Sequence, residues 1–167
     1  MGNTDGDGTD TAAVSVSDDE LITCWGLVHE AVTATDPLLL HGVGPSTQRL
    51  PAAEFEVLLR LLRSPECRLP MGELAREVSL TSGGLTKVVD RLRRLGYLER
   101  TPCPEDRRIS YAVLTRTGRE VAQHAHDRHA TLLRRHVLDV LGPRGVRDLS
   151  SLARRLRDAA RCTPNQP

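Results

Sequence analysis

The amino-acid sequence predicts a mainly α-helical fold that carries one small β-hairpin. Aromatic residues make up only 2% of the 167 residues, so the core must be aliphatic, which favours helices over an all-β sandwich. Apolar residues recur at spacings of three and four along most of the chain, as in amphipathic helices. One stretch near position 100 instead contains two short strand-like runs around a Pro-containing turn, which indicates a hairpin.

The chain is expected to form a single folded domain, residues 18–167, behind a disordered acidic tail. Residues 1–17 are mostly Gly, Asp, Thr and Ser and offer little apolar surface to bury. Residues 1–20 carry a charge of −6 and the remainder carries +7. Neither a secretory signal nor an apolar run of the ~18 residues that span a membrane is found. We therefore expect a cytoplasmic protein without membrane contact.

A first helix is predicted over residues 18–36. Ser17 and Glu20 have the spacing of a capping box, and the helix is expected to end before Pro37. Its apolar positions follow helical spacing: Leu21, Cys24, Trp25, Val28 and Val32.

Three further helices are predicted between residues 50 and 95. The helix at 50–63 is apolar around most of its circumference and should be central. The helices at 71–78 and 82–95 are joined by about three residues, which is the spacing of a helix-turn-helix. Thr81 is the expected cap of the second of these helices, and Gly96 is expected to end it.

A hairpin follows, with strands at 97–100 and 109–114 and a Pro-containing loop at 101–108. A hairpin directly after a helix-turn-helix is a wing. A long helix is then predicted over 115–141, capped by Thr115 or Thr117 and broken at Gly142-Pro143, with a last helix at 144–161.

The outward face of the helix at 82–95 is polar and begins with small residues, which suits contact with nucleic acid. An ordinary solvated face is the alternative interpretation, and the preceding helix and following hairpin favour the DNA interpretation. Arg107 and Arg108 near the hairpin tip are placed to enter a minor groove, although with Glu105 and Asp106 they also fit a self-compensating solvated turn. The candidate DNA-binding residues are Ser82, Gly83, Thr86, Lys87, Arg94, Arg107 and Arg108.

Five runs of sequence closely resemble the MarR family (multiple antibiotic resistance regulators) in order and spacing. They cover about residues 54–120 and comprise Leu74–Val78, Thr81–Leu92, Gly96–Arg100, Pro104–Arg108 and Leu114–Gly118. The resemblance implies a winged helix-turn-helix at 50–116 and a homodimer whose dimerisation helices, 18–36 and 117–161, interlock. It also implies that Ser82, Gly83, Thr86 and Lys87 enter the major groove.

For the wing, the resemblance implies that Arg108, with or without Arg107, enters the minor groove and that Asp106 braces the wing arginine. Cys103 departs from the pattern, since it stands where the family usually has Asp before Pro. The departure puts the local pairing of the wing in doubt rather than its fold.

These features predict a sequence-specific, DNA-binding transcriptional regulator. We expect a ligand-responsive repressor that binds a pseudo-palindromic operator on double-stranded DNA as a homodimer. Enzyme motifs such as a nucleophile elbow, a phosphate loop or HExxH are absent from the sequence, so no enzymatic activity is expected. The alternatives are a redox-sensing regulator that acts through a cysteine and a winged-helix protein-interaction module without DNA binding.

The signal is expected to be a small aromatic or anionic effector, as in many family members. Cys24, Trp25 and His29 on the first helix are the candidate ligand or redox residues, with a buried core cysteine as the alternative interpretation of Cys24. His41 and Arg49 are further ligand candidates by location.

The two other thiols that bear on the redox alternative lie outside the helices. Cys67, on a loop, and Cys103, in the wing, are both expected to be exposed. No CxxC pair occurs, and His126 and His129 are the sole adjacent-turn histidine pair on the long helix. No metal or cofactor is expected.

Overall fold

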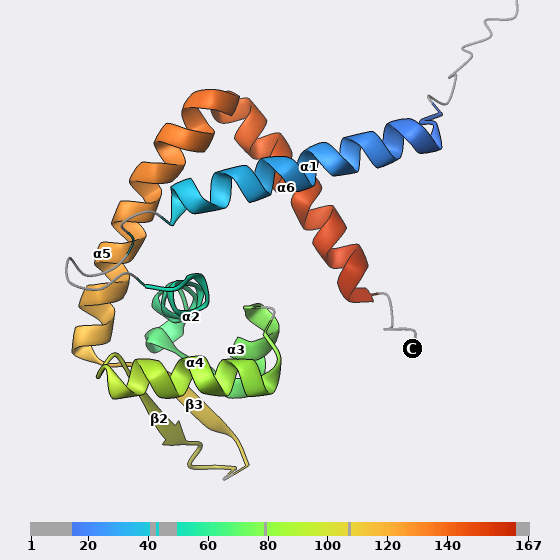
Figure 1. Ribbon diagram of the computed structural model, residues 1–167. Helices are drawn as coiled ribbons and strands as arrows, with labels where there is room; N and C mark the ends of the chain where they lie inside the picture. The colour runs from blue at the N-terminus through green and yellow to red at the C-terminus, as the bar shows by residue number, and fades with distance from the viewer. Residues whose placement is uncertain (1–14, 41–42, 44–49, 79, 107, 163–167) are drawn as a thin grey trace, which may run out of the picture. The chain divides into compact units, whose positions relative to one another are not determined.

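The computed structural model describes residues 15–40, 43, 50–78, 80–106 and 108–162 (Figure 1). The chain divides into two compact units, residues 1–35 and 36–167, and each is described by itself. The helices and strands in chain order are α1 (Asp18–Leu39), α2 (Ala52–Leu62), β1 (Arg68–Pro70), α3 (Met71–Glu77), α4 (Ser82–Arg94), β2 (Leu98–Pro102), β3 (Ser110–Leu114), α5 (Arg116–Leu133) and α6 (Asp139–Cys162). The predicted class, mainly helical with a β wing, is confirmed.

The first unit contains most of α1, whose start agrees with the predicted capping box. The backbone N–H of Ser17 donates to Oε2 of Glu20 at 2.9 Å, and the backbone N–H of Glu20 donates to Oγ of Ser17 at 3.3 Å. The backbone N–H and the hydroxyl of Ser17, which both donate to the Glu20 carboxylate at 2.9 Å, lower the pKa of that carboxyl. The predicted end before Pro37 is wrong, because α1 continues to Leu39. A proline in the last turn of a helix removes only one backbone hydrogen bond, which the helix tolerates here.

The core of the second unit is aliphatic and centres on α2, as predicted. α2 packs against α5, α4 and β3, so its apolar residues point in several directions into the interior. The core includes Val57, Leu58, Leu61, Leu74, Leu85, Val89, Leu92, Leu98, Leu114, Ala122 and Ala125.

The sheet is antiparallel and three-stranded, in the order β1-β3-β2. β2 and β3 form the predicted hairpin, with Leu98 opposite Leu114 and Pro102 opposite Ser110, and in Figure 1 this hairpin extends past α4. β1 was not predicted, because three residues are too few to show alternation and their partner β3 lies far along the chain. By pairing with β3, the strand β1 extends the hairpin into a small three-stranded sheet.

Caps at both ends fix the limits of α4 as predicted. Oγ1 of Thr81 accepts from the backbone N–H of Gly84 at 3.1 Å. At the other end Gly96 has φ +74°, and the backbone N–H of Tyr97 donates to the carbonyl of Leu92 at 2.9 Å. This is a Schellman ending, which needs a left-handed residue at Gly96.

The start of α5 is bonded to the end of α4. Oγ1 of Thr115 donates to the carbonyl of Gly96 at 2.7 Å and accepts from the backbone N–H of Gly118 at 2.9 Å. A Cβ added at Gly118 would lie 1.9 Å from the carbonyl oxygen of Tyr97, so only glycine fits there. The Thr115–Gly118 pair therefore joins the second helix of the helix-turn-helix directly to the long helix that follows the wing.

Beyond α5, a π-helical segment, Arg134–Leu138, leads into α6. Gly142 inside α6 has φ +67° and interrupts the helical conformation at the predicted Gly142-Pro143 break. Of the helices that the structure describes, none combines the length and the apolar character required to cross a membrane.

Candidate nucleic-acid interface

The outward face of α4 carries the side chains that the sequence indicates for DNA contact. Leu85, Val89 and Leu92 are buried, and the opposite side exposes Ser82, Gly83, Thr86, Lys87 and Arg94. Lys87 is exposed and, among the described residues, forms no ion pair or hydrogen bond.

Two neighbours of Lys87 on this face bond only to α4 itself. Oγ1 of Thr86 donates to the carbonyl of Ser82 at 2.9 Å, and Nε of Arg94 donates to the carbonyl of Asp90 at 3.4 Å. A Cβ at Gly83 would meet nothing within 4 Å. Nothing within the described chain therefore requires glycine at position 83.

The wing loop is shaped by Asp106. Its Oδ1 accepts from the backbone N–H of Arg108 at 2.9 Å, and its carbonyl accepts from the backbone N–H of Ile109 at 3.0 Å. Such an Asx turn fixes a short loop without secondary structure. The bracing contact that the structure shows for Asp106 is thus to the backbone of Arg108, whose side chain is exposed. Arg107 lies outside the described residues.

Cys103 corrects the expectation that the wing thiol is exposed, since only 9% of the residue is accessible. Its backbone N–H donates to the carbonyl of Ile109 at 2.9 Å, which continues the β2–β3 pairing into the loop. The departure from the family pattern at this position leaves the hairpin intact. Cys67 is half-buried rather than exposed.

The candidate signal residues on α1 are all exposed within the chain. Cys24 is a free, exposed thiol, so the alternative of a buried core cysteine is wrong for the chain as described. Trp25 is 60% exposed, and Nδ1 of His29 lies 3.2 Å from Oγ1 of Thr33. His41 and Arg49 lie outside the described residues. Among the described residues, none of the pockets is lined by Cys24, Trp25 or His29.

Within the described ranges no three His, Cys, Asp or Glu side chains gather to hold a metal ion. His126 and His129, on adjacent turns of α5, contact protein groups. His126 pairs with Asp127 at 2.9 Å, and its hydrogen bond lowers the pKa of the Asp127 carboxyl. Nδ1 of His129 lies 3.0 Å from the carbonyl of Leu39, and its ring packs against Phe55.

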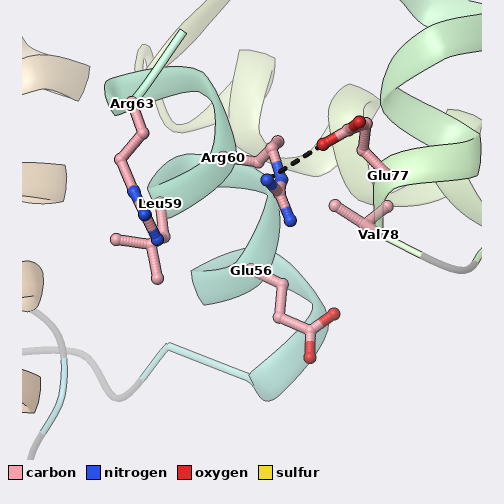
Figure 2. Close-up of a pocket in the computed structure, with 6 residues that line it drawn as sticks. All are labelled: Glu56, Leu59, Arg60, Arg63, Glu77 and Val78. Carbon is pink, nitrogen blue, oxygen red and sulfur yellow. Dashed lines mark ion pairs between the residues drawn. The ribbon is translucent and has the colours of Figure 1, made fainter. Parts of the chain in front are cut away.

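A hollow of about 320 Å³ lies between α2 and α3 (Figure 2). Arg60 and Glu77 bridge the two helices across it with an ion pair of 2.9 Å. Arg63 and Leu59 line one side and Glu56 another. Two carboxylates and two guanidinium groups line the hollow, so its lining carries no excess of positive charge.

One charged pair in the core of the second unit is not expected from the sequence. Glu54, in the first turn of α2, is only 3% exposed, and its Oε1 accepts from Nε of Arg91 on α4 at 2.7 Å. Burial raises the pKa of the Glu54 carboxyl, and the guanidinium of Arg91 opposes that effect. The signal was available, because Glu54 precedes Leu58 and Leu61 by four and seven residues and therefore lies on the buried face of α2.

The comparisons with known proteins agree with this geometry. A family model described as "MarR family" matches residues 50–109. The Escherichia coli multiple antibiotic resistance protein MarR is 34% identical over 107 residues, which are 64% of this chain and 72% of that protein.

Two solved structures from Streptomyces coelicolor have the same fold. Sco3205, a MarR family regulator crystallised in complex with DNA, has a TM-score of 0.77 and 28% identity, covering 92% of this chain and 94% of that chain. The regulator PcaV, crystallised with its natural ligand, has a TM-score of 0.69 and 26% identity, covering 87% and 99%. The capped helix-turn-helix and the paired wing agree with these relatives. The chain therefore belongs to the MarR family of winged helix-turn-helix, DNA-binding transcriptional regulators, which are not enzymes.

Proposed function

We propose that this chain is a ligand-responsive repressor that binds a pseudo-palindromic operator as a homodimer in the cytoplasm. The observation that carries the proposal is the unobstructed polar face of α4, with Lys87 unpaired within the described residues, beside a hairpin that exposes Arg108. A helix for the major groove and an arginine for the minor groove are the two elements by which winged helices read a duplex.

The small residues at the start of α4 support close approach to DNA. Gly83 has open space around it and lowers the stability of the helix by about 1 kcal/mol relative to Ala. A partner that must lie close to the backbone explains that cost, and the floor of a major groove is such a partner. Thr86, Lys87 and Arg94 then reach base edges and phosphates, while Ser82 contributes at the helix N-terminus.

The terminal helices support a second copy of the chain as partner. On α1, Trp25 is 60% and Ile22 71% exposed, and on α6 Leu152 and Leu156 are 54% and 57% exposed. Monomeric proteins rarely leave contiguous apolar surface of this kind uncovered. α1 carries five acidic and no basic residues, whereas α6 carries six arginines against three aspartates, so the two helices have complementary charge.

Two-fold symmetry then predicts an operator with two half-sites whose centres lie about one turn of DNA apart. The effector is proposed to shift the population between DNA-competent and DNA-incompetent dimers. PcaV, crystallised with its natural ligand, supports a small-molecule signal, and we propose a small aromatic or anionic compound.

The test is a fluorescence-anisotropy titration of the purified protein with the intergenic DNA beside its own gene, at several salt concentrations. Arg108→Ala is expected to weaken binding about tenfold and to lower the salt slope by about 1, as for one lost groove contact. Arg144→Ala is the matched control, since Arg144 is 93% exposed on α6 and pairs with Asp148. If Arg108→Ala binds the DNA as selectively and as tightly as wild type, the proposed role of the wing is contradicted. If the wild-type protein shows no selective binding, the proposal of a repressor is contradicted.

A further inference from the structure

Glu54 is the one charged side chain that is buried within the described residues. It lies in the first turn of α2, where the helix dipole favours a carboxylate. Its Oε1 bonds to Arg91, but its Oε2 is buried without any hydrogen-bond partner. A pair this poorly satisfied is a weak source of stability, because removing a carboxylate from water costs more than one ion pair returns. The pair therefore calls for another explanation.

Arg91 differs from the other polar side chains of α4 in its bonding partner. The side chains of Thr86, Arg93 and Arg94 bond within α4. Among the side chains of α4 that the structure describes, Arg91 alone forms an ion pair or hydrogen bond with another element. The buried side chains of α4 are the aliphatic Leu85, Val89 and Leu92, and Val88 packs against the same core.

Aliphatic contacts fix the distance between two helices better than they fix rotation, because hydrophobic burial has no preferred direction. A charge-assisted hydrogen bond does have one. The bond from Thr115 to Gly96 holds the end of α4, so a second directional contact at Arg91 is enough to set the rotation of α4 about its axis. A binding constellation needs its side chains held within about 10–20° of the productive geometry.

We propose that Glu54 is a positioning residue for DNA recognition: through Arg91 it sets the rotation of α4 and so aims the face with Thr86 and Lys87 at the major groove. The inference rests on the proposed function, since the consequence of this rotation is read out on DNA. Glu54 itself does not touch the duplex.

The test uses a duplex that the wild-type protein enriches from a random-sequence library, with a scrambled duplex of the same composition for comparison. In Glu54→Leu the acceptor is replaced by an apolar side chain, and Arg91 remains half exposed, so no unpaired charge is buried. The melting temperature is expected to stay within a few degrees of wild type. The preference for the enriched over the scrambled duplex is expected to fall about tenfold, which a merely structural residue would not produce.

Companion variants separate positioning from charge. Glu54→Gln keeps an oxygen acceptor for Arg91 and is expected to retain the preference. Arg91→Gln added to Glu54→Leu is expected to cause no further loss of preference, because both substitutions break the same contact. Arg93→Gln is the control, since its 3.6 Å partner Asp90 lies on α4 itself, and it is expected to weaken binding of both duplexes by the same factor.

A readout without DNA completes the design: in Glu54→Leu, the methyl resonances of Val88 and Val89 are expected to shift, because α4 changes its rotation. Should Glu54→Leu fail to fold, Glu54→Met supplies an unbranched apolar side chain for the same measurements. A folded variant with wild-type preference and unchanged methyl resonances would overturn the positioning role alone. If the wild-type protein enriches no duplex, the proposed function itself is overturned.

Discussion

The lobe built from α2 to α5 and the terminal helices α1 and α6 use amphipathic helices in opposite ways. In the lobe, α2 and α4 bury their apolar residues against neighbours in the same chain. In α1 and α6, which also carry apolar residues at helical spacing, no residue is buried. The same kind of sequence pattern therefore leads to a closed core in one region and to open apolar surface in the other.

The difference teaches that a helical stripe specifies which face is apolar but not which molecule covers it. In the lobe, the hairpin and the joint at Gly118 bring the covering surfaces from within the chain. For α1 and α6, a second copy supplies the cover in the proposal above. Substitutions that disrupt the lobe and the terminal helices separately test whether the two regions depend on different partners.

The largest effect is expected from Gly118→Ala in the lobe. The added Cβ would lie 1.9 Å from the carbonyl oxygen of Tyr97, so either α5 or the end of α4 must move. The expected loss is about 4 kcal/mol of unfolding free energy, measured by urea titration at fixed protein concentration. Gly72→Ala is the matched control: its Cβ would meet nothing within 4 Å, and stability should stay within about 1 kcal/mol. Equal losses in both variants would contradict the close fit at Gly118.

A smaller effect, on assembly instead of folding, is expected from Leu152→Asp on α6. Leu152 is 54% exposed in the chain, so the lobe should remain folded while the dimer dissociation constant rises about 100-fold, near 3 kcal/mol. Sedimentation velocity over a range of protein concentrations measures this constant.

The control for that substitution is Ser151→Asp, which places the same charge on the polar side of α6 and is expected to leave the dimer intact. Dimers that tolerate Leu152→Asp would show that the apolar face of α6 is not the interface. A lobe that unfolds with Leu152→Asp would show that the two regions are not independent.

The smallest effect is expected from pH, at the buried carboxyl of Glu54. Burial raises the pKa of this group above its ordinary value of 4.5, so the folded protein holds this proton more tightly than the unfolded chain does. The contribution to stability is therefore complete below pH 4.5 and declines as pH rises through the folded-state pKa. Wild type should lose stability relative to Glu54→Gln as pH rises above 4.5 in chemical denaturation. A difference that stays constant over this range would contradict a raised pKa.

Much of the fold was predictable because its signals are local. Ser17 and Thr81 cap their helices at the expected positions, and Thr115 caps α5 as one of the two expected candidates. A side-chain oxygen next to free backbone N–H groups needs no distant partner. Gly96 ends α4 for a similarly local reason, its left-handed φ. The polar face of α4 followed from spacing alone, once its apolar stripe was assigned.

The failures have different causes: β1 depends on a distant segment, whereas Pro37 and Cys103 depend on nearby residues. β1 forms only because β3 is present to pair with it, and Pro37 is accommodated because it falls in the last turn of a longer helix than expected. Cys103 is buried although loop residues are usually exposed, since pairing with Ile109 draws it into the hairpin.

By itself, the sequence determined the order of the helices, their caps, the helix-turn-helix spacing and the exposed polar face of α4. Only the tertiary structure decided that Glu54 would meet Arg91, that Gly118 would touch the backbone of Tyr97, and that β1 would join the wing. The physical reason is one of range: capping and helical periodicity act within a few residues, whereas these contacts depend on how separate elements pack.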